Sequence, residues 1–150
     1  MVERVRYGTC IAKKGERMSP ELDAKLRVAY ALIFAVKPAF ESEDADGPVL
    51  PSPFAIRGFE CGDGWYDALD ALCMNLQHAT KNGSPQVIAS QVKEKFGALR
   101  FYTCGHDVYQ DGMIVLAETM SARICEVCGN RGRTIRGGWI KTRCAEHEEV

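Results

Sequence analysis

Three cysteines and one histidine in the last part of the chain have the spacing of a zinc site. Cys125 and Cys128 form a Cys-x2-Cys pair, and Cys144 and His147 form a Cys-x2-His pair after fifteen intervening residues. Zinc in proteins takes four tetrahedral sulfur or nitrogen ligands, and a gap of two residues lets one tight turn offer both ligands of a pair. The spacing therefore predicts bound Zn²⁺. Because four protein ligands leave no open position for water, we expect the zinc to be structural.

Other uses of the same cysteines fit the sequence less well. A redox Cys-x2-Cys normally begins the helix of a βαβ unit, which this segment lacks. The signatures of zinc deaminases and of His-Glu-x-x-His metalloproteases are also missing from the sequence. The alternative that stays open is a pair of buried cysteines near an unrelated histidine.

The segment between the two ligand pairs predicts a basic β-hairpin. Residues 133–136 and 139–142 read as strands, and Gly137-Gly138 suits a two-residue turn with positive φ. A cysteine knuckle, a hairpin and a second ligand pair at the start of a short helix is a treble-clef-like order. The segment carries an aromatic residue and five cations, with no acidic residue: Trp139, Arg131, Arg133, Arg136, Lys141 and Arg143. We interpret them as binding residues for a protein, or for the phosphates and bases of a nucleic acid; the alternative is a solvated hairpin.

A second candidate surface lies in residues 93–102, where charged and bulky apolar residues alternate as in a strand with one face in water. Lys93, Lys95 and Arg100 are the candidate binding residues there, and plain sheet packing is the alternative. The loop Glu60–Asp67 offers a third candidate, because its carboxylates could serve acid–base chemistry or bind Mg²⁺. The alternative for this loop is that Asp63 caps a helix.

The composition is that of a soluble globular domain. The chain has 150 residues, of which 46% are hydrophobic, and a net charge of −1. The chain is long enough to bury a hydrophobic core. Its net charge is too small to attract it as a whole to a nucleic acid or an anionic membrane. The first residues lack the apolar core of a signal peptide, which predicts a protein of the reducing cytoplasm. Seven cysteines are an odd number, which argues against a disulfide framework.

The spacing of hydrophobic residues, together with capping residues, glycines and prolines, predicts three helices and a pair of strands. The first helix starts at Ser19-Pro20-Glu21 and runs to the residues before Pro38, and a proline-rich acidic loop follows over residues 38–54. The second helix runs from its N-cap Asp63 to residues 82–83. Residues 86–104 predict strands with a bulge or tight turn at Gly97. The third helix starts near residue 107 or 111, with a buried stripe of Met113, Leu116, Ala117, Met120 and Ile124.

These elements predict an α+β fold, in which a small antiparallel sheet has flanking helices and a C-terminal treble-clef-like zinc module. We divide the chain into residues 1–57, with the first helix and the acidic loop, an α+β core over residues 58–124, and the zinc module over residues 125–150. We expect the three parts to form one compact domain. The sequence predicts no role for Cys10, Cys61, Cys73 and Cys104.

Three blocks of the sequence together resemble a group of small bacteriophage and prophage proteins. The blocks are residues 58–65, residues 91–102, and Cys125–Gly129 with Cys144 and His147. The resemblance covers residues 58–147. It implies a phage origin, and hence the cytoplasm of a host cell, and small phage accessory proteins often act by binding, some of them to disarm host defences. The resemblance brings no enzymatic activity with it.

The expected function is therefore that of a non-enzymatic phage accessory protein with a structural zinc site. It would bind a host protein or protein complex, as a counter-defence inhibitor does, and would not bind membranes. A nucleic-acid-binding zinc protein is one alternative. A small hydrolase or nucleotide-binding enzyme that uses the Glu60–Asp67 loop with Lys93, Lys95 or Arg100 is the other.

Overall fold

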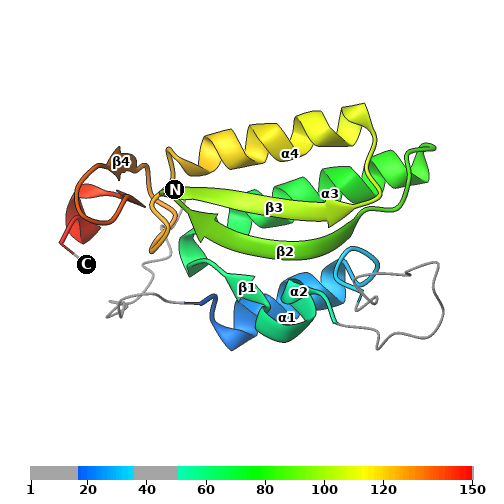
Figure 1. Ribbon diagram of the computed structural model, residues 1–150, viewed down its shortest axis with the longest axis horizontal. Coiled ribbons are helices and arrows are strands. Elements are labelled where there is room, and N and C mark those ends of the chain that lie inside the picture. Colours follow the sequence, from blue (N-terminus) through cyan, green and yellow to red (C-terminus); the bar gives the residue numbers. More distant parts are fainter. Residues whose placement is uncertain (1–16, 36–50, 150) are drawn as a thin grey trace, which may run out of the picture.

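A mixed three-stranded sheet lies between two pairs of helices, and a zinc-type hairpin closes one end (Figure 1). The computed structural model describes residues 17–35 and 51–149. The predicted acidic loop up to residue 50, and Cys10, lie outside the described residues. In chain order the elements are α1 (Pro20–Ala29), α2 (Pro53–Arg57), β1 (Phe59–Glu60), η1 (Asp63–Trp65), α3 (Tyr66–Lys81), β2 (Ile88–Lys95), β3 (Ala98–Cys104), α4 (Val108–Ser121), β4 (Arg133–Ile135), β5 (Lys141–Arg143) and η2 (Ala145–His147).

The sheet has the order β1-β2-β3, and the expectation of a purely antiparallel sheet is wrong. β2 and β3 pair antiparallel, but β1 pairs parallel with β2, with Phe59 opposite Val92. The crossover between the two parallel strands contains α3, as parallel pairing requires. β1 has only two residues, which is too short for a pattern of alternation to reveal it. The turn predicted at Gly97 is confirmed: Phe96 and Gly97 both have positive φ, 55° and 78°, as a two-residue hairpin turn requires.

The helices on both faces of the sheet contribute to one hydrophobic core. Figure 1 shows α3 and α4 on one side of the sheet and α1 and α2 on the other. On the α1 side, the ring of Phe34 lies 5.1 Å from that of Phe54 and 5.0 Å from that of Phe59. The start predicted for α1 is confirmed, but the helix ends at Ala29, and Phe34 reaches the core from a turn.

Two helix details predicted from sequence are wrong. Asp63 does not cap α3, because its Oδ1 accepts a hydrogen bond from the backbone N–H of Ser19 (2.6 Å) and η1 precedes the helix. The buried stripe predicted for α4 is wrong at Leu116 and Met120, which are exposed, whereas Met113, Ala117 and Ile124 pack against the core as predicted. Ile114 and Ser121, which were not predicted, are buried. The predicted end of α3 at residues 82–83 is confirmed, since Asn82 is its C-cap.

Asp107 begins α4 with a capping box, and this cap makes a testable contribution to acid stability. Its side chain accepts from the backbone N–H of Gln110 (2.8 Å), and the Gln110 side chain accepts from the backbone N–H of Asp107. The first of these hydrogen bonds, followed by one from the Ser84 side chain, lowers the pKa of Asp107. Since the pKa is lower in the folded than in the unfolded chain, the stabilisation is complete above the unfolded pKa, near 4. It is lost as the pH falls through the folded value.

We expect Asp107→Asn to flatten this part of the acid dependence, because asparagine caps a helix without titrating. The measurement is the melting temperature of wild type and variant between about pH 5 and pH 2, where the carboxylate titrates. The wild type should lose more than the variant over this range. If the melting temperatures of wild type and variant fall in parallel as the pH is lowered, titration of Asp107 does not contribute to the acid dependence of stability.

Candidate metal centre

The structure brings Cys125, Cys128, Cys144 and His147 together, with their ligand atoms all within 4.8 Å of one another. The Sγ atoms of Cys128 and Cys144 are 3.7 Å apart, and His147 Nδ1 is 3.2 Å from Cys144 Sγ and 3.7 Å from Cys125 Sγ. Tetrahedral ligands with Zn–S near 2.3 Å and Zn–N near 2.0 Å would be separated by about 3.5 to 3.8 Å. The cluster therefore fits a metal such as zinc, with Nδ1 as the histidine ligand.

The backbone around Cys125 forms a zinc-type knuckle. Gly129 has a φ of 77° and donates its N–H to the carbonyl of Cys125 (2.9 Å), so glycine turns the chain beneath the ligand atoms as its position predicts. Burial, the largest single effect, raises the pKa of the Cys125 thiol, but hydrogen bonds from the backbone N–H groups of Cys144, Cys128 and Val127 together outweigh it, so the pKa is lowered. For Cys128, burial raises the pKa to about 12. A thiolate held by N–H groups is the form that a metal binds.

The hairpin between the ligand pairs is present, but its predicted two-residue turn is wrong. Ile135 pairs with Lys141, so the connecting loop comprises residues 136–140. Gly137 and Gly138 lie within this longer loop, where a Cβ added to either would meet no described atom within 4 Å. His147 is the last residue of η2, so the predicted short final helix is present only as a single 3-10 turn.

The knuckle docks on the loop between β1 and α3. The backbone N–H of Gly64 donates to the carbonyl of Glu126 (2.8 Å), and the indole N–H of Trp65 donates to the carbonyl of Ile124 (2.9 Å). A Cβ on Gly64 would lie 2.1 Å from the Cys125 carbonyl oxygen, and one on Gly62 would lie 2.5 Å from the Glu126 carbonyl oxygen. The Gly-x-Gly of the Glu60–Asp67 loop is thus explained by close backbone contact with the knuckle.

A buried ion pair joins the knuckle to β5. The Glu126 side chain accepts from Arg143 Nη1 at Oε2 (2.9 Å) and from the backbone N–H of Gly62 at Oε1 (3.0 Å). Both residues are buried, and Arg143 Nε is the only buried side-chain nitrogen or oxygen without a partner in the described residues. Thr142, next to Arg143, donates from Oγ1 to the carbonyl of Gly97 (2.5 Å), which ties β5 to the turn of the main sheet.

A cavity of about 270 Å³ opens where the hairpin meets the sheet. It brings together four of the binding residues predicted from sequence: Lys93, Trp139, Lys141 and Arg143. Its other lining residues are Arg17, Glu60, Glu94 and Glu126. We call this space the junction cavity. Sequence reasoning assigned Arg17, Glu94 and Glu126 to no site; the only signal for Glu126 is its position inside the Cys-x2-Cys pair.

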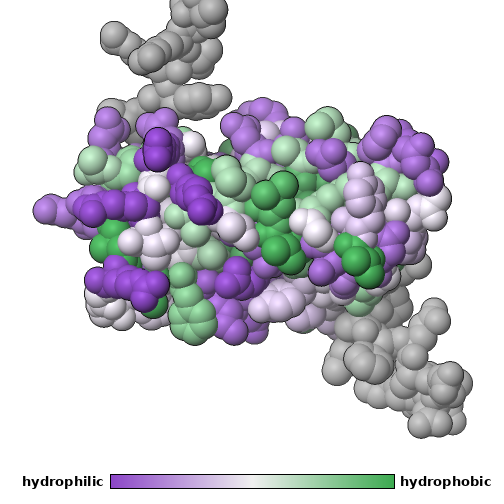
Figure 2. All heavy atoms as spheres, turned by 90° about the horizontal axis from the view of Figure 1, so that it is seen from above, coloured by the Kyte–Doolittle hydropathy of each residue, from purple (hydrophilic) through white to green (hydrophobic). Residues whose placement is uncertain are grey.

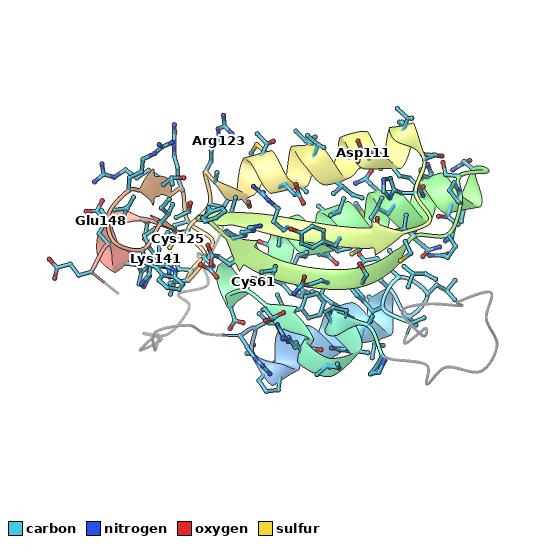
Figure 3. All side chains as sticks on the ribbon, in the orientation of Figure 1. Cys61, Asp111, Arg123, Cys125, Lys141 and Glu148 are labelled. Atoms are coloured by element: carbon cyan, nitrogen blue, oxygen red, sulfur yellow. The ribbon has the colours of Figure 1, made fainter. Side chains whose placement is uncertain are left out.

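The other predicted binding residues lie outside the junction cavity. Arg100 Nη1 is 3.8 Å from Glu118 on the α4 side of β3, and Arg133 pairs with Glu148 (2.6 Å) at the outer edge of the module. Lys95, Arg131 and Arg136 are exposed. Figure 3 marks the module with Cys125, Lys141 and Glu148. The structure thus divides the predicted contact surface into a set around the cavity and scattered surface cations.

No family model, curated protein or solved structure matches the chain. The resemblance to bacteriophage and prophage proteins therefore stays a prediction. None of the described helices is long and apolar enough to span a bilayer.

The cysteines outside the cluster fall into two kinds. Cys61 and Cys73 are buried, and burial raises the pKa of both thiols, so they are protonated and inert at neutral pH. Cys104 is exposed at the end of β3. Cys10 lies outside the described residues.

Proposed function

We propose that the chain is a non-enzymatic binding protein, in which a structural zinc ion holds a treble-clef-like hairpin against the sheet and the junction cavity receives an acidic segment of a partner protein. The observation that carries the proposal is the convergence of Lys93 from β2 with Trp139 and Lys141 from the hairpin around one cavity. Tryptophan and arginine are enriched among the residues that contribute most binding energy at protein interfaces, and Trp139 lines this cavity together with Arg143.

The charges around the cavity favour an acidic partner. Each carboxylate of the lining already accepts a hydrogen bond from this chain: Glu126 from Gly62 and Arg143, Glu94 from the backbone N–H of Gly97, and Glu60 from Gln91. By contrast, no hydrogen bond or ion pair joins Lys93 or Arg17 to another described residue. The cavity therefore offers cationic donors, those of Lys93 and Arg17, that a partner's carboxylates would satisfy.

Trp139 gives this surface its apolar contact. Its side chain is 74% exposed on the loop between β4 and β5, and an exposed tryptophan at a cavity rim offers a large contact area at low cost in conformational entropy.

Zinc would hold the hairpin in its fold. The hairpin has only two three-residue strands, which are too short to be stable alone. The sequence blocks that resemble phage proteins make a host protein, such as a defence component, our proposed partner.

We expect Trp139→Ala and Lys93→Glu each to weaken partner binding about tenfold or more, the size typical of central interface residues. The test is capture of partner from a nuclease-treated bacterial lysate by the tagged, zinc-loaded chain, followed by titration of the captured protein. Lys81→Glu, an equal charge change at an exposed position on α3, is the control and should bind as wild type does.

Two outcomes would count against the proposal. If the cavity variants bind the partner as tightly as the control does, the junction cavity is not the contact surface. If capture disappears on nuclease treatment, the ligand is a nucleic acid, and the alternative that the basic hairpin contacts phosphates and bases replaces the protein partner.

A further inference from the structure

Helix α4 has an apolar face that points away from the rest of the molecule. With 3.6 residues per turn, its buried residues Gln110, Ile114 and Ser121 lie on one side. The opposite side, which we call the outer face of α4, carries the exposed residues Val108, Tyr109, Val115, Leu116 and Met120. Figure 2 shows hydrophobic side chains gathered over α4 on this face of the molecule. Exposed apolar residues that share one helix face make that face a candidate interaction surface.

Gly112 lies on the outer face in the first half of α4, and the fold of a single chain gives no reason for it. It is in the helix without a positive φ, and an added Cβ would meet no described atom within 4 Å. Alanine at such a position would stabilise the helix by about 1 kcal/mol. A glycine does, however, let the backbone of a second helix approach closely. The outer face is therefore shaped for a helix.

The two ends of the outer face carry opposite charges. Asp111 borders it near the start of α4, and Arg123 borders it just after the end of the helix; both are exposed (Figure 3). Twelve residues separate them, about 18 Å along a helix axis. Glu118, the other charged residue of α4, points inward and accepts from the backbone N–H of Phe101 (2.8 Å). The outer face is thus mainly apolar in its middle, where Thr119 is the exposed polar residue, and it has an acidic residue at one end and a basic residue at the other.

A surface with this pattern is complementary to itself when it is turned end over end. We infer that α4 of one chain packs antiparallel against α4 of a second copy about a two-fold axis, with Leu116 and Val115 near the centre and the Asp111 end of each copy against the Arg123 end of the other. A parallel arrangement would bring like charges together. The inference is independent of the partner proposed for the junction cavity.

The contact is limited in size, which sets the expected strength. A helix of 14 residues is about 21 Å long, and an interface along one such helix is at the small end of specific interfaces. We therefore expect a dimer that dissociates on dilution, with a dissociation constant on the order of 10 µM.

Sedimentation velocity of the zinc-loaded full chain, from about 1 to 200 µM so as to bracket that constant, tests the inference. We expect a monomer–dimer equilibrium in the wild type and at least about tenfold weaker association in Leu116→Glu. The leucine is 64% exposed, so the variant should fold. Val28→Glu is the matched control, because Val28 is an equally apolar residue, 82% exposed on α1. A wild type that stays monomeric throughout, or a dimer that Leu116→Glu leaves unchanged, would overturn the inference.

Two further variants test the arrangement. Asp111→Arg and Arg123→Asp should each weaken the dimer, and the double variant should restore it, because the exchange returns opposite charges to each contact. Gly112→Ala should raise the melting temperature of the monomer and yet weaken the dimer, a combination that helix propensity alone does not produce. A double variant as weak as the single ones would rule out the antiparallel pairing.

Discussion

Removal of the metal is expected to lower the melting temperature by roughly 10 °C or more, the largest effect of any single change to this protein. The ligand set Cys125, Cys128, Cys144 and His147 joins the knuckle to the end of the chain. Structural zinc in small modules contributes about 10 kcal/mol or more of binding free energy, much of which is folding free energy. For a chain of this length, each kcal/mol lost shifts the melting temperature by about 2–4 °C.

The loss should reach beyond the hairpin. The knuckle covers the β1–α3 loop through the hydrogen bonds to Gly64 and Trp65, and β5 holds the Gly97 turn. Without the metal these contacts lose their support, while the core around Phe34 does not include the ligands. We therefore expect the helical circular dichroism to persist and amide exchange to rise in residues 125–149 and in the β1–α3 loop.

Metal analysis and thermal melts of the purified chain, before and after a chelator, are the measurements. About one zinc per chain is expected, and Cys128→Ser should reproduce the chelated melt. Cys104→Ser is the matched control, because Cys104 is exposed and outside the cluster, and it should retain both metal and stability. Zinc that is lost with no change in the melting curve would contradict a structural site and return Cys125 and Cys144 to consideration as reactive thiols.

The metal cluster could be predicted from the sequence because residue type and short spacing specify it. Two residues between ligands fix the local turn, and the geometry of zinc fixes the rest. The junction cavity could not be predicted in this way. Lys93 and Trp139 are far apart in the chain, and they meet because long-range contacts, such as that of Thr142 with the Gly97 turn and that of Gly64 with Glu126, bring the hairpin to the sheet. Nothing in the local pattern of either segment encodes that contact.

The rotation of α4 about its axis shows why an apolar stripe in the sequence does not always identify the buried face of a helix. Hydrophobicity assigned Leu116 and Met120 to the core, yet the structure buries Gln110 and Ser121 instead. Both polar side chains can be buried because they are satisfied: Gln110 donates to the carbonyl of Pro85 (2.9 Å), and Ser121 accepts from the backbone N–H of Leu99 (2.8 Å). These bonds fix the rotation of the helix and leave a second apolar face outside.

Gly64→Ala is expected to reduce the free energy of unfolding by about 2–4 kcal/mol. The new Cβ would lie 2.1 Å from the Cys125 carbonyl oxygen and 2.6 Å from the backbone nitrogen of Gly129. Both are backbone atoms of the knuckle, so neither can move aside as a flexible side chain would. Overpacking of this kind costs about 1–3 kcal/mol, and loss of the Gly64–Glu126 hydrogen bond adds about 1 kcal/mol.

Because the clash lies against the knuckle, Gly64→Ala should weaken zinc binding as well as folding. Urea unfolding gives the first quantity, and competition with a chromogenic chelator gives the second. Leu69→Ala, a cavity in the core of α3, separates the two effects: it should destabilise the fold by about 2–5 kcal/mol with little change in zinc affinity. Gly137→Ala, in open space, should change neither. Unchanged zinc affinity in Gly64→Ala would mean that the knuckle folds around its metal without docking on the β1–α3 loop, and that glycine is not needed there for the contact.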